Sequence, residues 1–147
     1  MIKKILLALL LLVTFPVLAD TIPIETNQRS TVDVQVQISG AQKTFPFLLD
    51  TGSGYTVLPG VPVDGVVSKK IEGITADGKK SIVQLYTIPS LKLGNCLVRD
   101  VEIAAIPGAG RPILGMEVIK RLGHVDINFQ NKTMTFDCPT GNEDGKK

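Results

Sequence analysis

The stretch from Phe45 to Leu58 constrains this chain most, because an apolar run leads directly into an acid. Residues 45–49 are apolar, Asp50-Thr51-Gly52-Ser53-Gly54 follows, and a second apolar run ends at Leu58. A carboxylate at the end of a buried strand is costly unless hydrogen bonds or a partner charge compensate it. The glycines on either side of Ser53 allow a tight turn. We therefore predict that Asp50 has a functional role, with a purely structural turn as the alternative.

The first nineteen residues have the pattern of a secretory signal peptide. Lys3 and Lys4 form a basic start, residues 5–18 are almost entirely apolar, and Val17-Leu18-Ala19 resembles a cleavage site. An uncleaved anchor is the alternative, but the apolar stretch is short for a span of about 20 residues and Pro16 interrupts it. We expect residues 1–19 to be removed. The mature protein would then be periplasmic or secreted, with no stable membrane span.

The composition of the mature chain bounds its partners and its size. Loss of the leader leaves 14 basic residues against 14 acidic ones, a formal net charge of zero. Since no basic patch is evident, nucleic acid is not an expected partner. The remaining residues can bury one modest core. We predict one domain over 20–138 and a polar, disordered tail over 139–147.

The first half of the mature chain is patterned as β-strands. The polar segment 20–30 suggests an arm or an edge strand, whereas residues 31–38 alternate with the period of a half-buried strand. Residues 43–49 are almost continuously apolar, which predicts a strand buried on both faces. Residues 66–75 and 79–88 suggest two strands joined at Ala76-Asp77-Gly78, because Asp-Gly between strand-like runs is a strong hairpin signal.

The second half of the chain is also patterned as β-strands, except for one short segment with helical spacing. Residues 91–95 end a strand in a turn, and residues 96–106 suggest the next strand. After Ile113-Leu114-Gly115, apolar residues at 116, 118, 119 and 122 have helical spacing, and Gly123 would end that helix. Residues 125–129 and 134–136 alternate as strands. The predicted class is therefore all-β with one short helix, and Ile113-Leu114-Gly115 loosely echoes the run that ends in Asp50-Thr51-Gly52.

These two elements carry a resemblance to a known family. Leu48-Leu49-Asp50-Thr51-Gly52-Ser53 resembles the active-site signature of aspartic proteases, and Ile113-Leu114-Gly115 before a helix resembles a second element of that fold. In order and spacing, residues 32–136 are similar to single-domain bacterial members of the retropepsin-like family. The resemblance implies a single-domain retropepsin-like acid protease barrel.

The resemblance also implies a reaction. Hydrolysis of an amide without a nucleophilic side chain or metal needs a base for water and an acid for the leaving nitrogen. Two adjacent carboxyls that share one proton supply both. This chain has one Asp-Thr-Gly, and Ile113 occupies the place of the second acid of a two-lobed protease. The implied enzyme is thus an aspartic endopeptidase that acts on extended peptides or proteins as a homodimer, with Asp50 of each copy at the twofold axis.

The family assigns further roles by resemblance. Thr51 would brace the two acid loops, the Gly52 N–H and the Ser53 hydroxyl would hydrogen-bond the carboxylates, and Ile113, Leu114 and Gly115 would support them. The hairpin at Ala76, Asp77 and Gly78 would be a flap that closes over substrate. No cofactor is implied, and two cysteines with one histidine fall short of the usual four zinc ligands.

Two questions stay open at the level of sequence. Cys96 and Cys138 would form a disulfide in an exported protein if the fold brings them together, and are otherwise two unrelated thiols. The same fold could also serve as a catalytically inactive module that binds extended peptides or an envelope protein. Natural substrate, cleavage preference and pH optimum are not encoded in any recognisable motif.

Overall fold

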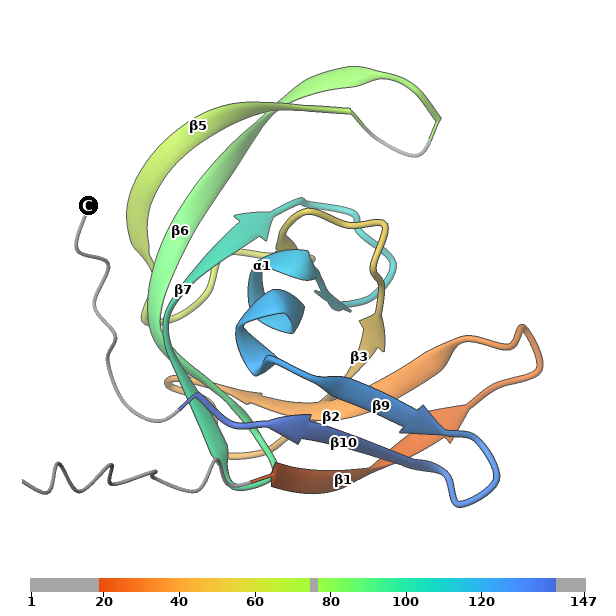
Figure 1. Ribbon diagram of the computed structural model, residues 1–147. Helices are drawn as coiled ribbons and strands as arrows, with labels where there is room; N and C mark the ends of the chain where they lie inside the picture. Colours follow the sequence, from red (N-terminus) through yellow and green to blue (C-terminus); the bar gives the residue numbers. More distant parts are fainter. Residues whose placement is uncertain (1–18, 75–76, 140–147) are drawn as a thin grey trace, which may run out of the picture.

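The computed structural model describes residues 19–74 and 77–139. This part of the chain folds into ten strands and one short helical segment, and Figure 1 shows the strands curving around that segment. The elements are β1 (Ala19–Thr26), β2 (Val32–Ile38), β3 (Phe45–Leu49), β4 (Thr56–Leu58), β5 (Val66–Ile74), β6 (Lys80–Leu93), β7 (Cys96–Ala105), β8 (Ile113–Leu114), α1 (Met116–Ile119), the 3₁₀ turn η1 (Lys120–Leu122), β9 (Val125–Asn128) and β10 (Thr133–Asp137).

The strands hydrogen-bond in the order β5-β6-β7-β4-β8-β3-β2-β1-β10-β9. The end of β6 also pairs with β2, where Val36 lies opposite Leu93 and Ile38 opposite Leu91. This extra pairing bends the sheet back on itself, so the structure is a partly closed barrel. The predicted class, mostly β with one short helix, is confirmed.

The core lies between the curved sheet and α1. It contains side chains from both halves of the chain, and its largest fully buried members include Phe47, Phe136, Leu85, Ile88, Leu91 and Leu93. Val118 and Leu122 of the helical segment are also fully buried. Each such side chain stabilises the fold by about 1.5–3 kcal/mol. The helix is therefore held by packing, although it has only one α turn.

Two strand predictions were wrong in detail. β1 is not an edge strand, because Ala19–Pro23 pairs with β10 and Ile24–Thr26 pairs with β2. β3 is not buried on both faces, since Phe47 is buried but Phe45 and Pro46 are exposed and Leu48 is only half-buried. The apolar run alone did not reveal that β3 is buried over only part of its length.

Two segments that were predicted as separate strands form one continuous strand in the structure. β6 is a single strand of 14 residues and passes through Pro89. On either side of this residue the ladder to β7 continues, with Ile88 opposite Val101 and Ser90 opposite Arg99. A proline removes only one donor from a ladder. The predicted helix over residues 116–122 is confirmed in position, but its second turn is 3₁₀, and Gly123 ends it with φ of 65°.

Cys96 and Cys138 form a disulfide in the structure, with their Cα atoms 5.5 Å apart. The bond joins the start of β7 to the residue that follows β10. At the same corner the Asn95 N–H donates to the Asp20 carboxylate over 3.0 Å. The disulfide and this hydrogen bond thereby hold both ends of the described domain, at Asp20 and Cys138, against the turn between β6 and β7.

Replacing both cysteines with serine should lower the free energy of unfolding by about 4 kcal/mol. The bridged residues are 42 positions apart, and closing a loop of that length removes a corresponding amount of entropy from the unfolded chain. Urea unfolding of the oxidised protein and the double variant measures the difference. Equal midpoints and slopes for the two proteins would contradict a stabilising role for the bond.

Several predictions fall on residues that the structure does not describe. These are most of the signal peptide, Ala76 of the flap, and residues 140–147 of the tail. Within 19–74 and 77–139, no helix combines the length and the apolar character that crossing a bilayer requires.

Candidate active site

Asp50 follows β3 at the point where this strand meets β8. The two strands are parallel neighbours, with Leu48 opposite Ile113 and Leu49 opposite Leu114. The Asp50 N–H donates to the Leu114 carbonyl over 3.1 Å. The two elements that echo each other in the sequence therefore lie side by side, and one of them carries the acid.

The loop after β3 holds the Asp50 carboxylate by a backbone donor. The Gly52 N–H donates to Asp50 Oδ1 over 2.8 Å, and the Ser53 N–H donates to the Asp50 carbonyl over 3.2 Å. A Cβ atom at Gly52 would lie 3.1 Å from the same carboxylate oxygen. The donor role that the resemblance gave to the Gly52 N–H is thus present in a single chain.

The Ser53 hydroxyl has a different partner from the one that the resemblance implied, and the role of Thr51 between two loops stays a prediction. The Ser53 hydroxyl donates to the Tyr55 carbonyl over 2.7 Å and not to the carboxylate, so it stabilises the turn. Thr51 is exposed, and its hydroxyl makes no hydrogen bond within the described part of the chain. The loop therefore presents Thr51 and Gly52 to the outside of the single subunit.

Gly115 allows α1 to approach the acid loop. The Met116 N–H donates to the Ser53 carbonyl over 2.8 Å, and the Glu117 N–H donates to the Gly54 carbonyl over 3.0 Å. A Cβ atom at Gly115 would lie 2.2 Å from the Tyr55 carbonyl oxygen, well inside van der Waals contact. Only glycine fits this crossing, so residues 113–115 support the acid loop through their backbone.

The sequence analysis missed Thr56, which completes this crossing. Its side chain is fully buried, and its hydroxyl accepts a hydrogen bond from the Gly115 N–H over 3.2 Å. Buried polar groups in proteins are nearly always paired. A threonine in a short apolar strand was the available signal, but threonine also favours strands for reasons unrelated to hydrogen bonding.

A cavity of about 500 Å³ lies between the acid loop and the β5–β6 hairpin. Figure 1 shows this hairpin projecting from the barrel and curving over α1 and β7. Asp50 and residues 52–55 form one side of the cavity. The hairpin contributes Ile71, Gly73, Ile74, Ser81 and Val83, and the floor includes Val57, Ala104, Ile106, Ala109 and Ile113. The candidate catalytic acid thus opens onto a largely apolar cavity under a projecting hairpin.

The predicted flap is present as a hairpin, although its cavity-lining residues are not those at its turn. Ile74 pairs with Lys80 at the end of the ladder, and Gly78 has φ of 80°, which suits a glycine in a turn. Asp77 and Gly78 do not line the cavity. Alternation along β5 and β6 could have identified Ile71, Gly73, Ser81 and Val83, which form two register pairs on one face of the hairpin.

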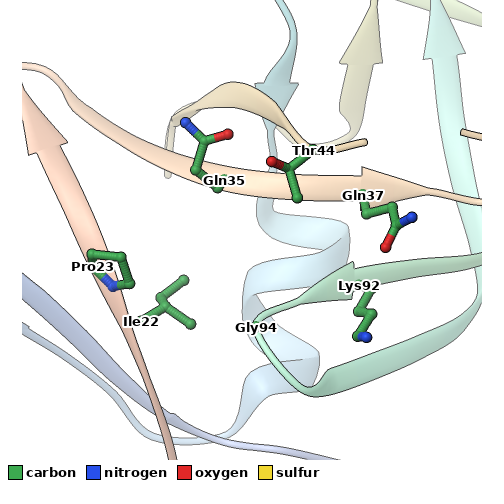
Figure 2. A pocket seen from close by; sticks show the side chains of 7 residues that line it. All are labelled: Ile22, Pro23, Gln35, Gln37, Thr44, Lys92 and Gly94. Atoms are coloured by element: carbon green, nitrogen blue, oxygen red, sulfur yellow. The ribbon is translucent and has the colours of Figure 1, made fainter. Parts of the chain in front are cut away.

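A second hollow lies on the opposite part of the sheet, where β1 leaves β2 (Figure 2). It has a volume of about 260 Å³ and is lined by Ile22, Pro23, Gln35, Gln37, Thr44, Lys92 and Gly94. None of these residues carries a carboxyl group. The hollow therefore lacks the groups for acid–base hydrolysis, and the cavity at Asp50 is the candidate active site.

Charged groups beside the acid loop are arranged in ion pairs. Arg111, two residues before Ile113, pairs with Asp33 of β2. Arg121 pairs with Glu117 over 3.3 Å and also donates to the carbonyl groups of Arg99 and Asp100. Within the described residues, no three His, Cys, Asp or Glu side chains gather as metal ligands would.

Glu117 is the acid whose environment the fold changes most clearly. Burial raises the pKa of Glu117 above its ordinary value near 4.5, while the Arg121 guanidinium acts in the opposite direction. Its Oε2 atom is buried without a hydrogen-bond partner among the described residues, and Glu102 on β7 adds a like charge nearby. The folded state therefore binds a proton at this group more tightly than the unfolded chain does.

The effect of Glu117→Gln on the free energy of unfolding should become more stabilising as the pH rises. Since the folded-state pKa is raised, the contribution of Glu117 to stability is greatest below the unfolded-state value near 4.5. It decreases as the pH rises through that value toward the folded-state pKa. The difference in unfolding free energy between variant and wild type should therefore increase from pH 4 to pH 7. Urea unfolding across this range tests the slope, and a constant difference would contradict it.

Comparison with known proteins identifies the family of this chain. Residues 34–118, more than half of the chain, match the family described as Aspartyl protease. The chain therefore belongs to the aspartyl protease family. The match includes the acid loop and Gly115 and ends within α1.

A solved structure with a similar fold is the crystal structure of a retropepsin-like aspartic protease from Rickettsia conorii. It aligns with a TM-score of 0.58 and 15% sequence identity, over 81% of this chain and 91% of that chain. The fold is thus retropepsin-like. None of the curated protein sequences matches this chain.

Proposed function

We propose that this protein is an aspartic endopeptidase that hydrolyses extended peptide or protein substrates. The proposal rests on the position of Asp50, whose carboxylate is held by the Gly52 N–H and opens onto the cavity beneath the β5–β6 hairpin. Membership of the aspartyl protease family supports it. The residue, its loop and the cavity supply one carboxyl and a place for the substrate beside it.

The chemistry needs a second carboxyl, and we propose that Asp50 of a second copy supplies it. The sequence has one Asp-Thr-Gly, and the parallel neighbour of its strand, Ile113-Leu114-Gly115, carries no acid. Thr51 and Gly52 are exposed at the tip of the acid loop, where a twofold axis could bring two loops together. One carboxyl of the pair would be ionised and the other protonated, because two adjacent negative charges repel.

The proposed reaction then balances within the pair. The ionised carboxylate takes a proton from water, the water oxygen bonds to the peptide carbonyl carbon, and the protonated carboxyl gives its proton to the carbonyl oxygen. On collapse of the tetrahedral intermediate the C–N bond breaks and the protonated carboxyl gives its proton to the leaving nitrogen. The other carboxylate takes a proton from one hydroxyl of the intermediate, which becomes the carbonyl of the product acid. The pair ends in its starting state with one shared proton, so no cofactor is consumed.

The dimer we propose would not interleave the terminal strands of two chains. β1 already pairs with β10 of the same chain, and β10 pairs with β9. The contacts between copies would instead centre on the acid loops and the hairpins. Ile74 and Ile82 support this, because these large apolar side chains on the hairpin are 71% and 77% exposed in one subunit.

We further propose that the enzyme is exported and acts in the periplasm or outside the cell. Cleavage after Ala19 would leave Asp20 as the first residue, already within β1. The disulfide between Cys96 and Cys138 supports an oxidising compartment.

Peptide cleavage by the purified mature protein, measured from acidic to neutral pH, tests the proposal. Sedimentation velocity on the same samples reports whether active preparations contain dimers. A strict monomer that cleaves no peptide in a diverse library but binds extended peptides would instead indicate a non-catalytic module of the same fold.

A further inference from the structure

A row of four side chains crosses the sheet beneath the cavity. In register, Leu85 of β6 lies opposite Ala104 of β7, Ala104 opposite Val57 of β4, and Val57 opposite Ile113 of β8. Residues opposite each other on neighbouring strands project from the same face of a sheet. Three of the four, Ile113, Val57 and Ala104, line the cavity floor, and Leu85 is buried at the end of the row.

Ala104 is the smallest side chain in this row. Leu85 and Val57 on either side of it are fully or almost fully buried, at 0% and 6% exposure. Each carries two or three more carbon atoms than alanine. The floor is consequently lowest at Ala104, which itself lines the cavity.

The depression lies on the same face of the sheet as Asp50, with β4 and β8 between β7 and β3. The row continues from Ile113 to Leu48 of β3, its register partner. Asp50 follows two residues later and therefore continues the same face of the strand. Asp50, Ile113, Val57 and Ala104 all line the one cavity.

The surroundings of Ala104 are apolar. Val57, Val83 and Leu85 are buried with it in one cluster, against which Ile71, Ile106 and Ile113 pack. Asp50 and Glu72 are the only charged residues that line the cavity within the described chain, and Glu72 pairs with Lys80 over 2.8 Å. A charged substrate side chain would lose its water here without gaining an opposite charge, which is unfavourable.

We propose that Ala104 determines the size of the substrate side chain that the cavity at Asp50 accepts near the scissile bond. The space that it leaves suits a long apolar side chain such as leucine, methionine or phenylalanine. This inference rests on the proposed function. Because a twofold dimer would present the same depression on each side of Asp50, the preference applies to the residues on both sides of the bond.

Substitution of Ala104 with valine or isoleucine tests the inference. Either change raises the floor and should lower kcat/KM about tenfold or more for peptides with leucine or phenylalanine near the scissile bond, since a misfit of one or two methylene groups costs that much in an apolar pocket. Peptides with alanine at that position should change less than about twofold. The readout is the ratio of kcat/KM between leucine or phenylalanine peptides and alanine peptides. A general loss of stability lowers both values and does not alter their ratio.

Ala105→Val is the matched control. Ala105 is the next residue on β7, is half-buried, and lies opposite Gln84 and Leu58, so it projects from the other face. It does not line the cavity. The ratio of kcat/KM between leucine and alanine peptides should stay at the wild-type value in this variant.

The outcomes separate the inference from the proposed function. If the wild type cleaves no peptide, the proposed function fails and the inference fails with it. If the wild type cleaves but Ala104→Val keeps the wild-type ratio, only the inference is overturned. Should the larger variants not fold, Ala104→Gly deepens the floor: a shift toward phenylalanine supports the inference, and an unchanged ratio overturns it.

Discussion

Asp50→Asn is expected to lower kcat for peptide hydrolysis by about 10⁴-fold, because acid–base catalysis by a positioned group contributes about 10²- to 10⁴-fold. Asparagine keeps the size of the side chain and can still accept the 2.8 Å hydrogen bond from the Gly52 N–H. It can neither take a proton from water nor carry the shared proton. In a homodimer a single substitution also removes both carboxyls, so no acid remains at the axis.

The matched control for this variant is Asp126→Asn. Asp126 lies on β9, is exposed, and does not line the cavity. The two variants carry the same change in charge and should unfold at similar urea concentrations. Activity should stay within about twofold of wild type for Asp126→Asn. Comparable activity in Asp50→Asn and wild type would refute the assigned mechanism.

Mixing the inactive variant with wild type tests whether two copies form the site. If the pair is shared between subunits, a growing excess of Asp50→Asn should draw wild-type chains into mixed dimers with one carboxyl each. Activity per wild-type chain should then fall toward zero, provided that subunits are allowed to exchange. Activity that is independent of the added variant would place the whole site within one chain.

Local chemistry made the acid loop and its partner element predictable from the sequence. An acid at the end of an apolar run is rare because burial of its charge is costly, and Ile113-Leu114-Gly115 has a similar form. Their adjacency in the structure follows from the parallel pairing of β3 and β8. The β5–β6 hairpin was also predictable, because Asp-Gly between two strand-like runs is a strong local signal for a hairpin.

The features that sequence reasoning missed depend on contacts between distant segments. Ala104 is an ordinary strand residue until Leu85 and Val57 are placed on either side of it. The Ser53 hydroxyl was expected on the carboxylate, but the turn brings it to the Tyr55 carbonyl. For β1, the alternation of Ile22 and Ile24 was a usable signal, and both residues are buried.

The contact between Gly115 and the acid loop leads to the second large expected effect. Gly115→Ala should lower the free energy of unfolding by about 3 kcal/mol or more, the upper range for overpacking. The added Cβ would lie 2.2 Å from the Tyr55 carbonyl oxygen and 2.4 Å from its carbon. Both atoms belong to the backbone, so no rotation of a side chain relieves the clash. Either α1 or the acid loop must move.

Movement of either segment would disturb the site as well as the fold. The Met116 and Glu117 N–H groups hold the Ser53 and Gly54 carbonyls, and the Gly115 N–H is bonded to the buried Thr56 hydroxyl. Separation of α1 from the loop would break these bonds and leave Thr56 unpaired in the core, which is itself destabilising. Peptide hydrolysis should therefore fall together with stability, even at temperatures where the variant stays folded.

Gly60→Ala provides the comparison that isolates this contact. A Cβ atom at Gly60 would meet nothing within 4 Å, so urea unfolding should change by no more than about 0.5 kcal/mol. If Gly115→Ala unfolds at the same urea concentration as Gly60→Ala and keeps full activity, α1 is not fixed against the acid loop. The geometry of Asp50 must then be maintained by the β3–β8 pairing alone.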